Sequence, residues 1–207
     1  MTKRNVLIVG RIIIALLALA ALVAQIVHLQ QLGILNLANI FSYFTILSNV
    51  FLSIVFLIGA VALFQHREPS PGFDLVRGSA AVAIIIVGIV YGILLSNQDL
   101  GHLLPWVNIV HHYVTPLAGL ADWLILPPKS KLRASQLGYW LIYPLVYLVY
   151  TLIRGPITGF YPYFFVNPGA VGGYGVVALY CIGIFVAFLV VGGILLFLGN
   201  RLPRTLN

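Results

Sequence analysis

The stretch "NIVHHYVTPLAGLADWLILPPKSKLR", residues 108–133, decides the fold. Its first part, residues 108–126, is apolar enough to form a helix that crosses a bilayer. Yet this apolar run contains His111, His112 and Asp122. Ionisable side chains are costly in a membrane, so they usually face the interior of a helix bundle and mark candidate functional sites. The stretch therefore predicts a membrane protein with a polar interior.

The composition of the whole chain supports an all-α, polytopic membrane protein. Of the 207 residues, 61% are hydrophobic and only 7% are charged, whereas a soluble domain has about 25% charged residues. Several apolar runs are long enough to cross a bilayer, and they predict one six-span domain over residues 1–207. The first run is longer than the core of a signal peptide, which favours a retained helix. The expected spans are residues 7–28, 40–64, 77–96, 105–126, 136–154 and 173–199.

Basic residues are distributed unequally between the two ends of these spans. Ten of the eleven Lys and Arg residues lie on one side, and Arg154 lies on the other. This pattern predicts that both termini are cytoplasmic in a multi-pass protein of the cell membrane, specifically a bacterial inner membrane. The net charge of +7 then reports topology and contact with membrane lipid, and it does not indicate a nucleic-acid partner. The single Cys181 excludes an intrachain disulfide and a cysteine metal cluster.

Three spans carry a polar stripe with the period of a helix. Lipid cannot satisfy the hydrogen bonds of such stripes, so we expect the second, fourth and fifth spans to face a common interior. For single residues an alternative stays open, because Ser and Thr often bond to their own backbone and Tyr often forms an interfacial belt. The stripes contain Ser42, Thr45, Asn49 and Ser53; Asn108, His112, Thr115, Gly119 and Asp122; and Trp140, Tyr143, Tyr147, Thr151 and Arg154, with Tyr150 at the edge.

Depth along the spans brings a threonine and a histidine to the same level. At 1.5 Å per residue, Thr45 lies about 8 Å and His112 about 10 Å below the outer surface. Asp122 lies about 15 Å deeper than His112 in a regular helix, so we expect it to pair with Lys129 or with another helix. His111 and His112 point about 100° apart, and His112 fits the polar stripe better.

A threonine and a histidine that face each other suggest a nucleophile and its general base. Thr45 and His112 are therefore the candidate catalytic pair. A site near the outer surface would meet acyl chains, so hydrolysis of a lipid-like ester is chemically consistent with this pair, and we expect no metal or other cofactor. An oxyanion needs hydrogen-bond donors. The candidate donors and other supporting residues are Asn49, Asn108, His111, Asp122, Tyr147, Tyr150 and Arg154.

Three segments carry a resemblance to a known family. "FSYFTILSNVFLSIVFL" (41–57), "HHYVTPLAGLADWLILPP" (111–128) and "WLIYPLVYLVYTLIRGPITGFYPYFFVNP" (140–168) resemble the signature segments of the bacterial Pr-six-Pr membrane proteins. That family is distantly similar to the androgen-induced threonine hydrolases of animal membranes, which cleave fatty acid esters of hydroxy fatty acids. The resemblance implies that Thr45 in "YFTILSN" is the nucleophile. It also implies that His112, ten residues before Asp122, is the base, although an alignment on Pro116 favours His111.

The outer segment "RGPITGFYPYFFVNPGAVGGYG", residues 154–175, links the last two spans. Its glycines and prolines break helices, and its aromatic side chains suit the membrane interface. Two interpretations stay open, a surface loop and a lid over the site. In the second, Arg154 at the base of the lid holds a substrate carboxylate through two hydrogen bonds.

Two other functional classes fit parts of the sequence. A transporter or lipid-binding protein without chemistry needs the same polar interior, and turnover of a lipid ester would exclude it. A haem protein needs histidines from two helices, and His28 ends the first span near the depth of His111 or His112. A purified protein with a Soret band would favour the haem class.

Overall fold

The computed structural model describes residues 2–67 and 69–204, which contain helices and turns but no β-strand. The predicted all-α class is confirmed. Within the described residues, five helical segments are long and apolar enough to cross a membrane, as a multi-pass membrane protein requires. They are α1 (Lys3–Gln31), α3 (Phe44–Phe64), α4 (Pro71–Val90) with η1 (Tyr91–Leu95), η3 (Ala134–Gln136) with α7 (Leu137–Thr158), and α9 (Tyr174–Arg201).

The segment expected as the fourth span is helical, but it is not one regular α-helix. It consists of α5 (Pro105–Ile109), the π-helical turn η2 (Val110–Val114) and α6 (Thr115–Ile125), which follow one another without a gap. The structure therefore differs from the regular helix that the sequence predicts. A second π-helical turn, η1, ends the preceding helix. Such turns frequently lie at functional sites because they redirect side chains.

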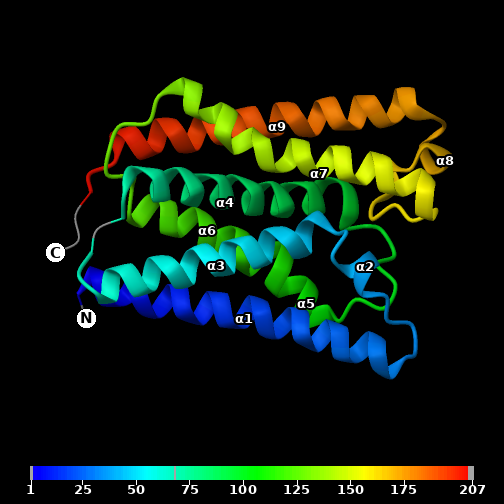
Figure 1. Ribbon diagram of the computed structural model, residues 1–207, viewed down its shortest axis with the longest axis horizontal. Coiled ribbons are helices and arrows are strands. Elements are labelled where there is room, and N and C mark those ends of the chain that lie inside the picture. The colour runs from blue at the N-terminus through cyan, green and yellow to red at the C-terminus, as the bar shows by residue number, and fades with distance from the viewer. Residues whose placement is uncertain (1, 68, 205–207) are drawn as a thin grey trace.

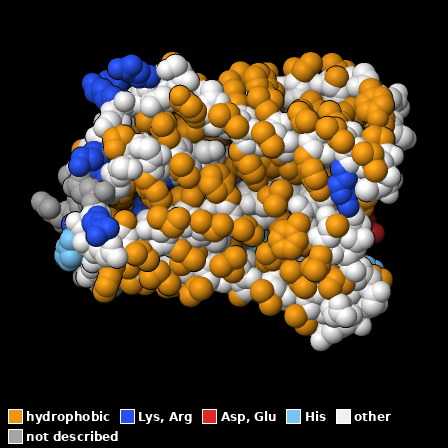
Figure 2. Space-filling model, in the orientation of Figure 1, with side chains coloured by type: hydrophobic (Ala, Val, Ile, Leu, Met, Phe, Trp, Pro, Cys, Tyr) orange, Lys and Arg blue, Asp and Glu red, His pale blue; other side chains and the backbone are white. Residues whose placement is uncertain are grey.

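The long helices run alternately in opposite directions, and both ends of the chain lie at one end of the molecule (Figure 1). Short elements cap the opposite end: α2 (Leu37–Ile40), η4 (Phe164–Val166) and α8 (Pro168–Val171). Lys and Arg side chains gather mainly at the end that holds the termini, and hydrophobic side chains cover the face between the two ends (Figure 2). The visible surface therefore consists of a hydrophobic band between the two ends and a cluster of basic side chains at the end that holds the termini.

Helix α4 lies at the centre of the bundle, where it packs against α3, α6, α7 and α9. Small residues allow this close approach, as they do in membrane helices generally. A Cβ atom on Gly78 would lie 2.3 Å from the Trp140 ring, and one on Gly88 would lie 3.0 Å from Pro116. The polar stripes did not reveal this central helix, because the buried face of α4 in the middle of the bundle is mostly Ala, Val and Ile.

Four charged side chains form a buried network near the end that holds the termini. Asp122 accepts hydrogen bonds from Arg11 of α1 at 2.6 Å and from Arg77 of α4 at 3.1 Å. Arg77 also pairs with Asp74 at 3.0 Å. Arg11 and Arg77 were counted among the flanking basic residues, but they are buried and paired. Asp122 therefore pairs with other helices, as one of the two predictions stated. Its two partners are Arg11 on α1 and Arg77 on α4.

Candidate functional site

Thr45 and His112 meet in the half of the bundle away from the termini. Thr45 lies in the first turn of α3, and its Oγ1 atom is 3.4 Å from Nε2 of His112 in η2. The other ring nitrogen of His112, Nδ1, is 3.2 Å from the carbonyl oxygen of Asn108. A carbonyl oxygen only accepts, so Nδ1 carries the proton and Nε2 is left to accept one from the threonine hydroxyl. This is the arrangement of a nucleophile with an oriented base.

The π-helical turn η2 gives the two neighbouring histidines different partners. His111 Nε2 is 3.0 Å from the carbonyl oxygen of Ala18 in α1, which makes His111 a contact between helices. The ring of His112 instead stacks on Tyr91 of η1, with the ring centroids 4.1 Å apart. Both histidines are buried, but only His112 contacts Thr45. The sequence left His111 and His112 as alternatives for the partner of Thr45, and in the structure this partner is His112.

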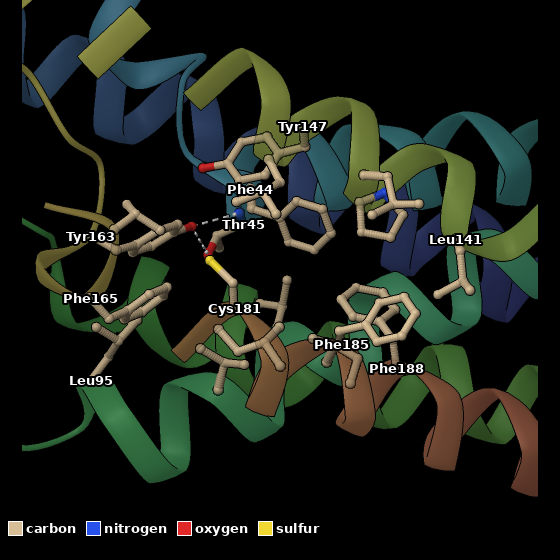
Figure 3. Close-up of a pocket in the computed structure, with 18 residues that line it drawn as sticks. Phe44, Thr45, Leu95, Leu141, Tyr147, Tyr163, Phe165, Cys181, Phe185 and Phe188 are labelled. Atoms are coloured by element: carbon tan, nitrogen blue, oxygen red, sulfur yellow. Dashed lines mark hydrogen bonds between the residues drawn. The ribbon is translucent and has the colours of Figure 1, made fainter. Parts of the chain in front are cut away.

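Tyr163 is a further member of the site. Its hydroxyl lies 3.1 Å from the backbone nitrogen of Thr45 and 3.2 Å from Thr45 Oγ1 (Figure 3). The tyrosine oxygen accepts from the Thr45 N–H, so its own proton can point to Thr45 Oγ1, whose proton then points to His112. Burial raises the pKa of Tyr163 to about 12, so the phenol stays protonated at neutral pH. The sequence marked this outer segment as a candidate lid but did not single out Tyr163.

Asn49 holds the backbone around the site and has little capacity left for a substrate. Its Nδ2 atom donates to the carbonyl oxygen of Thr45 at 2.9 Å and to that of His111 at 3.4 Å. Its Oδ1 atom accepts from the hydroxyl of Thr115 at 2.7 Å. Asn49 therefore fixes α3 against η2 and α6. Asn108 is only partly occupied, since its Nδ2 atom donates to Tyr91 at 2.7 Å and its buried Oδ1 atom has no partner among the described residues.

The polar stripe of α7 contacts more than the predicted neighbour, since Trp140 donates to the carbonyl oxygen of Leu75 in α4. Its other hydrogen bonds join α7 to residues 39–48 and reach neither Thr45 nor His112. They are Tyr143 to Ser48 at 3.1 Å, Tyr147 to the Ser42 carbonyl at 2.9 Å, Tyr150 to Ser42 at 3.0 Å, and Arg154 to Asn39 at 2.8 Å.

Two candidate residues lie apart from the Thr45–His112 pair. Arg154 donates to Asn39 and lies over the ring of Phe160 at 5.2 Å. Asp122 belongs to the buried charge network with Arg11 and Arg77. Among the described residues, no three His, Cys, Asp or Glu side chains come together as metal ligands.

Two hollows meet at Thr45. The first, which we name the apolar chamber, lies between α3, α4, α7 and α9 and has a volume of about 100 Å³. The second, which we name the outer vestibule, is lined by His112 and by polar residues of the loop between η1 and α5. Thr45, Leu95 and Tyr163 line both hollows. Thr45 therefore lies at the boundary between the two hollows.

Comparison with known proteins gave no relative, since the chain matches no family model, no curated protein and no solved structure.

Proposed function

We propose that the protein is an integral membrane hydrolase of lipid esters, with Thr45 as the nucleophile and His112 as the general base. One observation carries the proposal. The buried Thr45 hydroxyl lies 3.4 Å from a histidine nitrogen whose ring is oriented through its other nitrogen by the Asn108 carbonyl. A threonine that merely satisfied its own hydrogen bond would need neither an oriented imidazole nor two adjoining hollows.

The proposal includes six spans with both termini in the cytoplasm. The run of α5, η2 and α6 over residues 105–125 is about 31 Å long at 1.5 Å per residue, which matches the hydrocarbon thickness of a bilayer. The basic residues outside the buried network support the orientation, since Arg154 alone lies toward the end opposite the termini, in the last part of α7. Thr45 and His112 then lie in the outer part of the membrane.

Acylation follows from the hydrogen bonds of the site. The Thr45 oxygen attacks the ester carbonyl, and its proton passes to Nε2 of His112. The bond between Thr45 Oγ1 and the acyl carbon forms, and the bond from that carbon to the alcohol oxygen breaks. His112 returns the proton to the leaving alcohol. A water molecule then attacks the acyl-threonine, again through His112, and the products are a fatty acid and the restored hydroxyl.

The oxyanion of the intermediate has two available donors, the backbone N–H of Thr45 and the hydroxyl of Tyr163. The Thr45 N–H donates to the Tyr163 hydroxyl, and a carbonyl oxygen that took the place of the tyrosine oxygen would accept from this N–H while the hydroxyl rotates toward it. The Thr45 N–H belongs to the first turn of α3, where backbone donors have no partner within the helix. A site that keeps such donors oriented stabilises developing negative charge without reorganisation.

The resemblance to the Pr-six-Pr proteins and to the androgen-induced hydrolases is part of this proposal, and Thr45 and His112 are the residues on which it rests. Esters of hydroxy fatty acids carry a carboxylate, and Arg154 was the residue expected to hold it. Arg154 instead bonds to Asn39 and lines neither hollow. We therefore propose acyl esters as the substrate class.

A panel of esters tests the proposal against lipid binding without chemistry. Purified protein in detergent should release fatty acid from acyl esters, and Thr45→Val protein should not, because valine keeps the shape of the side chain but lacks the hydroxyl. Binding of the same lipids with no turnover by either protein would assign the molecule to the non-enzymatic class.

A further inference from the structure

The apolar chamber is elongated, with one end at Thr45 and an opposite end that we name the inner end. Tyr163 and Thr45 lie at one end, and Leu141 and Phe188 lie at the other (Figure 3). The walls between them are aliphatic and aromatic side chains of α4, α7 and α9. A hollow with these walls takes a hydrocarbon chain, because burying apolar surface is favourable and the lining offers few hydrogen-bonding groups to a polar guest.

The chamber opens toward the lipid between α7 and α9. These helices touch near the end that holds the termini, where Gly192 lets the Leu137 side chain approach. They separate toward the opposite end of the molecule (Figure 1), and the chamber lies in that space. Leu145 and Phe185 line the chamber and are also exposed on the outside of the bundle. A chain can therefore enter from the bilayer without crossing water.

The outer vestibule differs from the chamber in polarity and charge. Its lining includes Gln25, Gln98, Asp99 and His102. Asp99 carries a formal negative charge, and the described lining residues include no Lys or Arg. Gln25 already bonds to the His102 carbonyl and the Leu104 N–H, so the partners for hydroxyl groups or a positive charge are Gln98 and Asp99. The charge of Asp99 disfavours a carboxylate, so an uncharged or cationic alcohol fits the vestibule better.

We infer that the site takes acyl esters of uncharged or cationic alcohols, with the acyl chain in the apolar chamber and the alcohol in the outer vestibule. The inference rests on the proposed function for the position of the ester carbonyl at Thr45. It departs from the resemblance, which implies a leaving group with a carboxylate. The chain that fits is short. The wall from Ile86 to Leu95 spans roughly 13 Å at 1.5 Å per residue, which is enough for about ten carbons.

Cys181 supplies a built-in reporter, since it lines the chamber and is the single cysteine of the chain. Its alkylation by N-ethylmaleimide would be followed by mass spectrometry in the presence of 1-O-alkylglycerols, which are ethers and cannot be hydrolysed. We expect protection to increase with chain length up to about ten carbons, reaching roughly tenfold slower alkylation, and then to stay constant.

Matched variants on α7 distinguish two causes of protection: binding of the ligand in the chamber, and a general effect of the ligand on the detergent micelle. Leu141→Trp fills the inner end, so protection should reach its plateau at shorter chains. Ile142→Trp changes a neighbouring residue that is exposed and lies outside the chamber, so it should leave the length profile unchanged. Absence of protection at every chain length, or the same profile in Leu141→Trp, would overturn the acyl chamber.

The head group is tested with alkoxyacetates, which place a carboxylate beside the same ether. We expect several-fold weaker protection than with the glycerol ethers of equal length, and Asp99→Asn should reduce the difference. Equal protection by both series in the unaltered protein would overturn the assignment of the alcohol. Because neither ligand is hydrolysed, these results stand apart from the test of catalysis. Protection without ester turnover would reject the hydrolase and keep the chamber.

Discussion

His112 Nε2 lies 3.4 Å from Thr45 Oγ1 across the boundary between the π-helical turn η2 and the first turn of α3. The contact depends on three features that come from different parts of the chain. Asn108 orients the imidazole, Tyr91 stacks on it, and Tyr163 contacts the threonine from the outer segment. This arrangement allows the threonine hydroxyl to donate to the histidine, as the proposed mechanism requires, and the following predictions depend on it.

The two histidines should differ in their effects on activity. His112→Ala removes the proton acceptor, so kcat for ester hydrolysis should fall by about 10³-fold or more, as it does when one member of a catalytic unit is lost. His111→Ala is the matched control, because His111 contacts Ala18 of α1 and not Thr45. It should lower thermal stability but keep more activity than His112→Ala. The reverse order of kcat values would assign the base to His111.

Tyr163→Phe should show whether the Tyr163 hydroxyl stabilises the oxyanion or contributes to substrate binding. The phenylalanine keeps the packing on Phe165, which stacks at 5.1 Å, and removes the hydroxyl at Thr45. We expect kcat to fall by about 10²-fold with little change in KM, the effect of losing one oxyanion donor. Tyr174→Phe, at an exposed position, serves as the control. Wild-type kcat in Tyr163→Phe would remove this residue from the mechanism.

The buried charge network should be essential for stability. Asp122→Asn leaves Arg11 and Arg77 without their shared carboxylate, and breaking such a buried pair costs about 3–5 kcal/mol. Thermal unfolding in detergent micelles should show a clear decrease in Tm. Asp99→Asn in the exposed loop provides the comparison. Equal Tm values for the two variants would mean that the network contributes little.

Close packing of α4 predicts a difference between two helical glycines. Gly78→Ala places a Cβ atom 2.3 Å from the Trp140 ring, whereas Gly10→Ala meets nothing within 4 Å. Overpacking of this kind costs about 1–3 kcal/mol. Gly78→Ala should therefore unfold at a lower temperature than the wild-type protein, and Gly10→Ala should not. A stable Gly78→Ala protein would show that Trp140 can move aside.

The proposed topology is open to a direct test with reporter fusions. A reporter after Asn207 should respond as cytoplasmic, and one inserted within residues 160–170 should respond as external. Signals on the same side would contradict both the six spans and the position of the site near the outer surface.

Much of this architecture was predictable because membrane helices need long apolar runs and because polar stripes mark their buried faces. The stripes brought Thr45 and His112 together, and they also paired α7 with the beginning of α3 through Tyr147 and Ser42. Other features have no local signal. The π-helical turn η2 contacts η1 through the stacking of His112 on Tyr91, which no sequence pattern marks. The central place of α4 depends on small residues that meet large ones such as Trp140 on other helices.

Tyr163 was hard to predict for a related reason. It lies in an outer segment rich in Gly, Pro and aromatic residues, where tyrosines normally suit the membrane interface. Only the fold of that segment back onto α3 places its hydroxyl at Thr45. Arg154 shows the opposite case, since its isolated positive charge suggested a ligand site, but the structure ties it to Asn39.

The most direct test of the central claim is to locate the covalent adduct. Purified protein would be treated with a lipophilic fluorophosphonate and digested, and the modified residue would be identified by mass spectrometry. The adduct should lie on Thr45, it should form on Thr45→Ser protein, and it should be absent from Thr45→Val and His112→Ala. Modification of a different residue, or full ester turnover by Thr45→Val, would contradict the threonine mechanism.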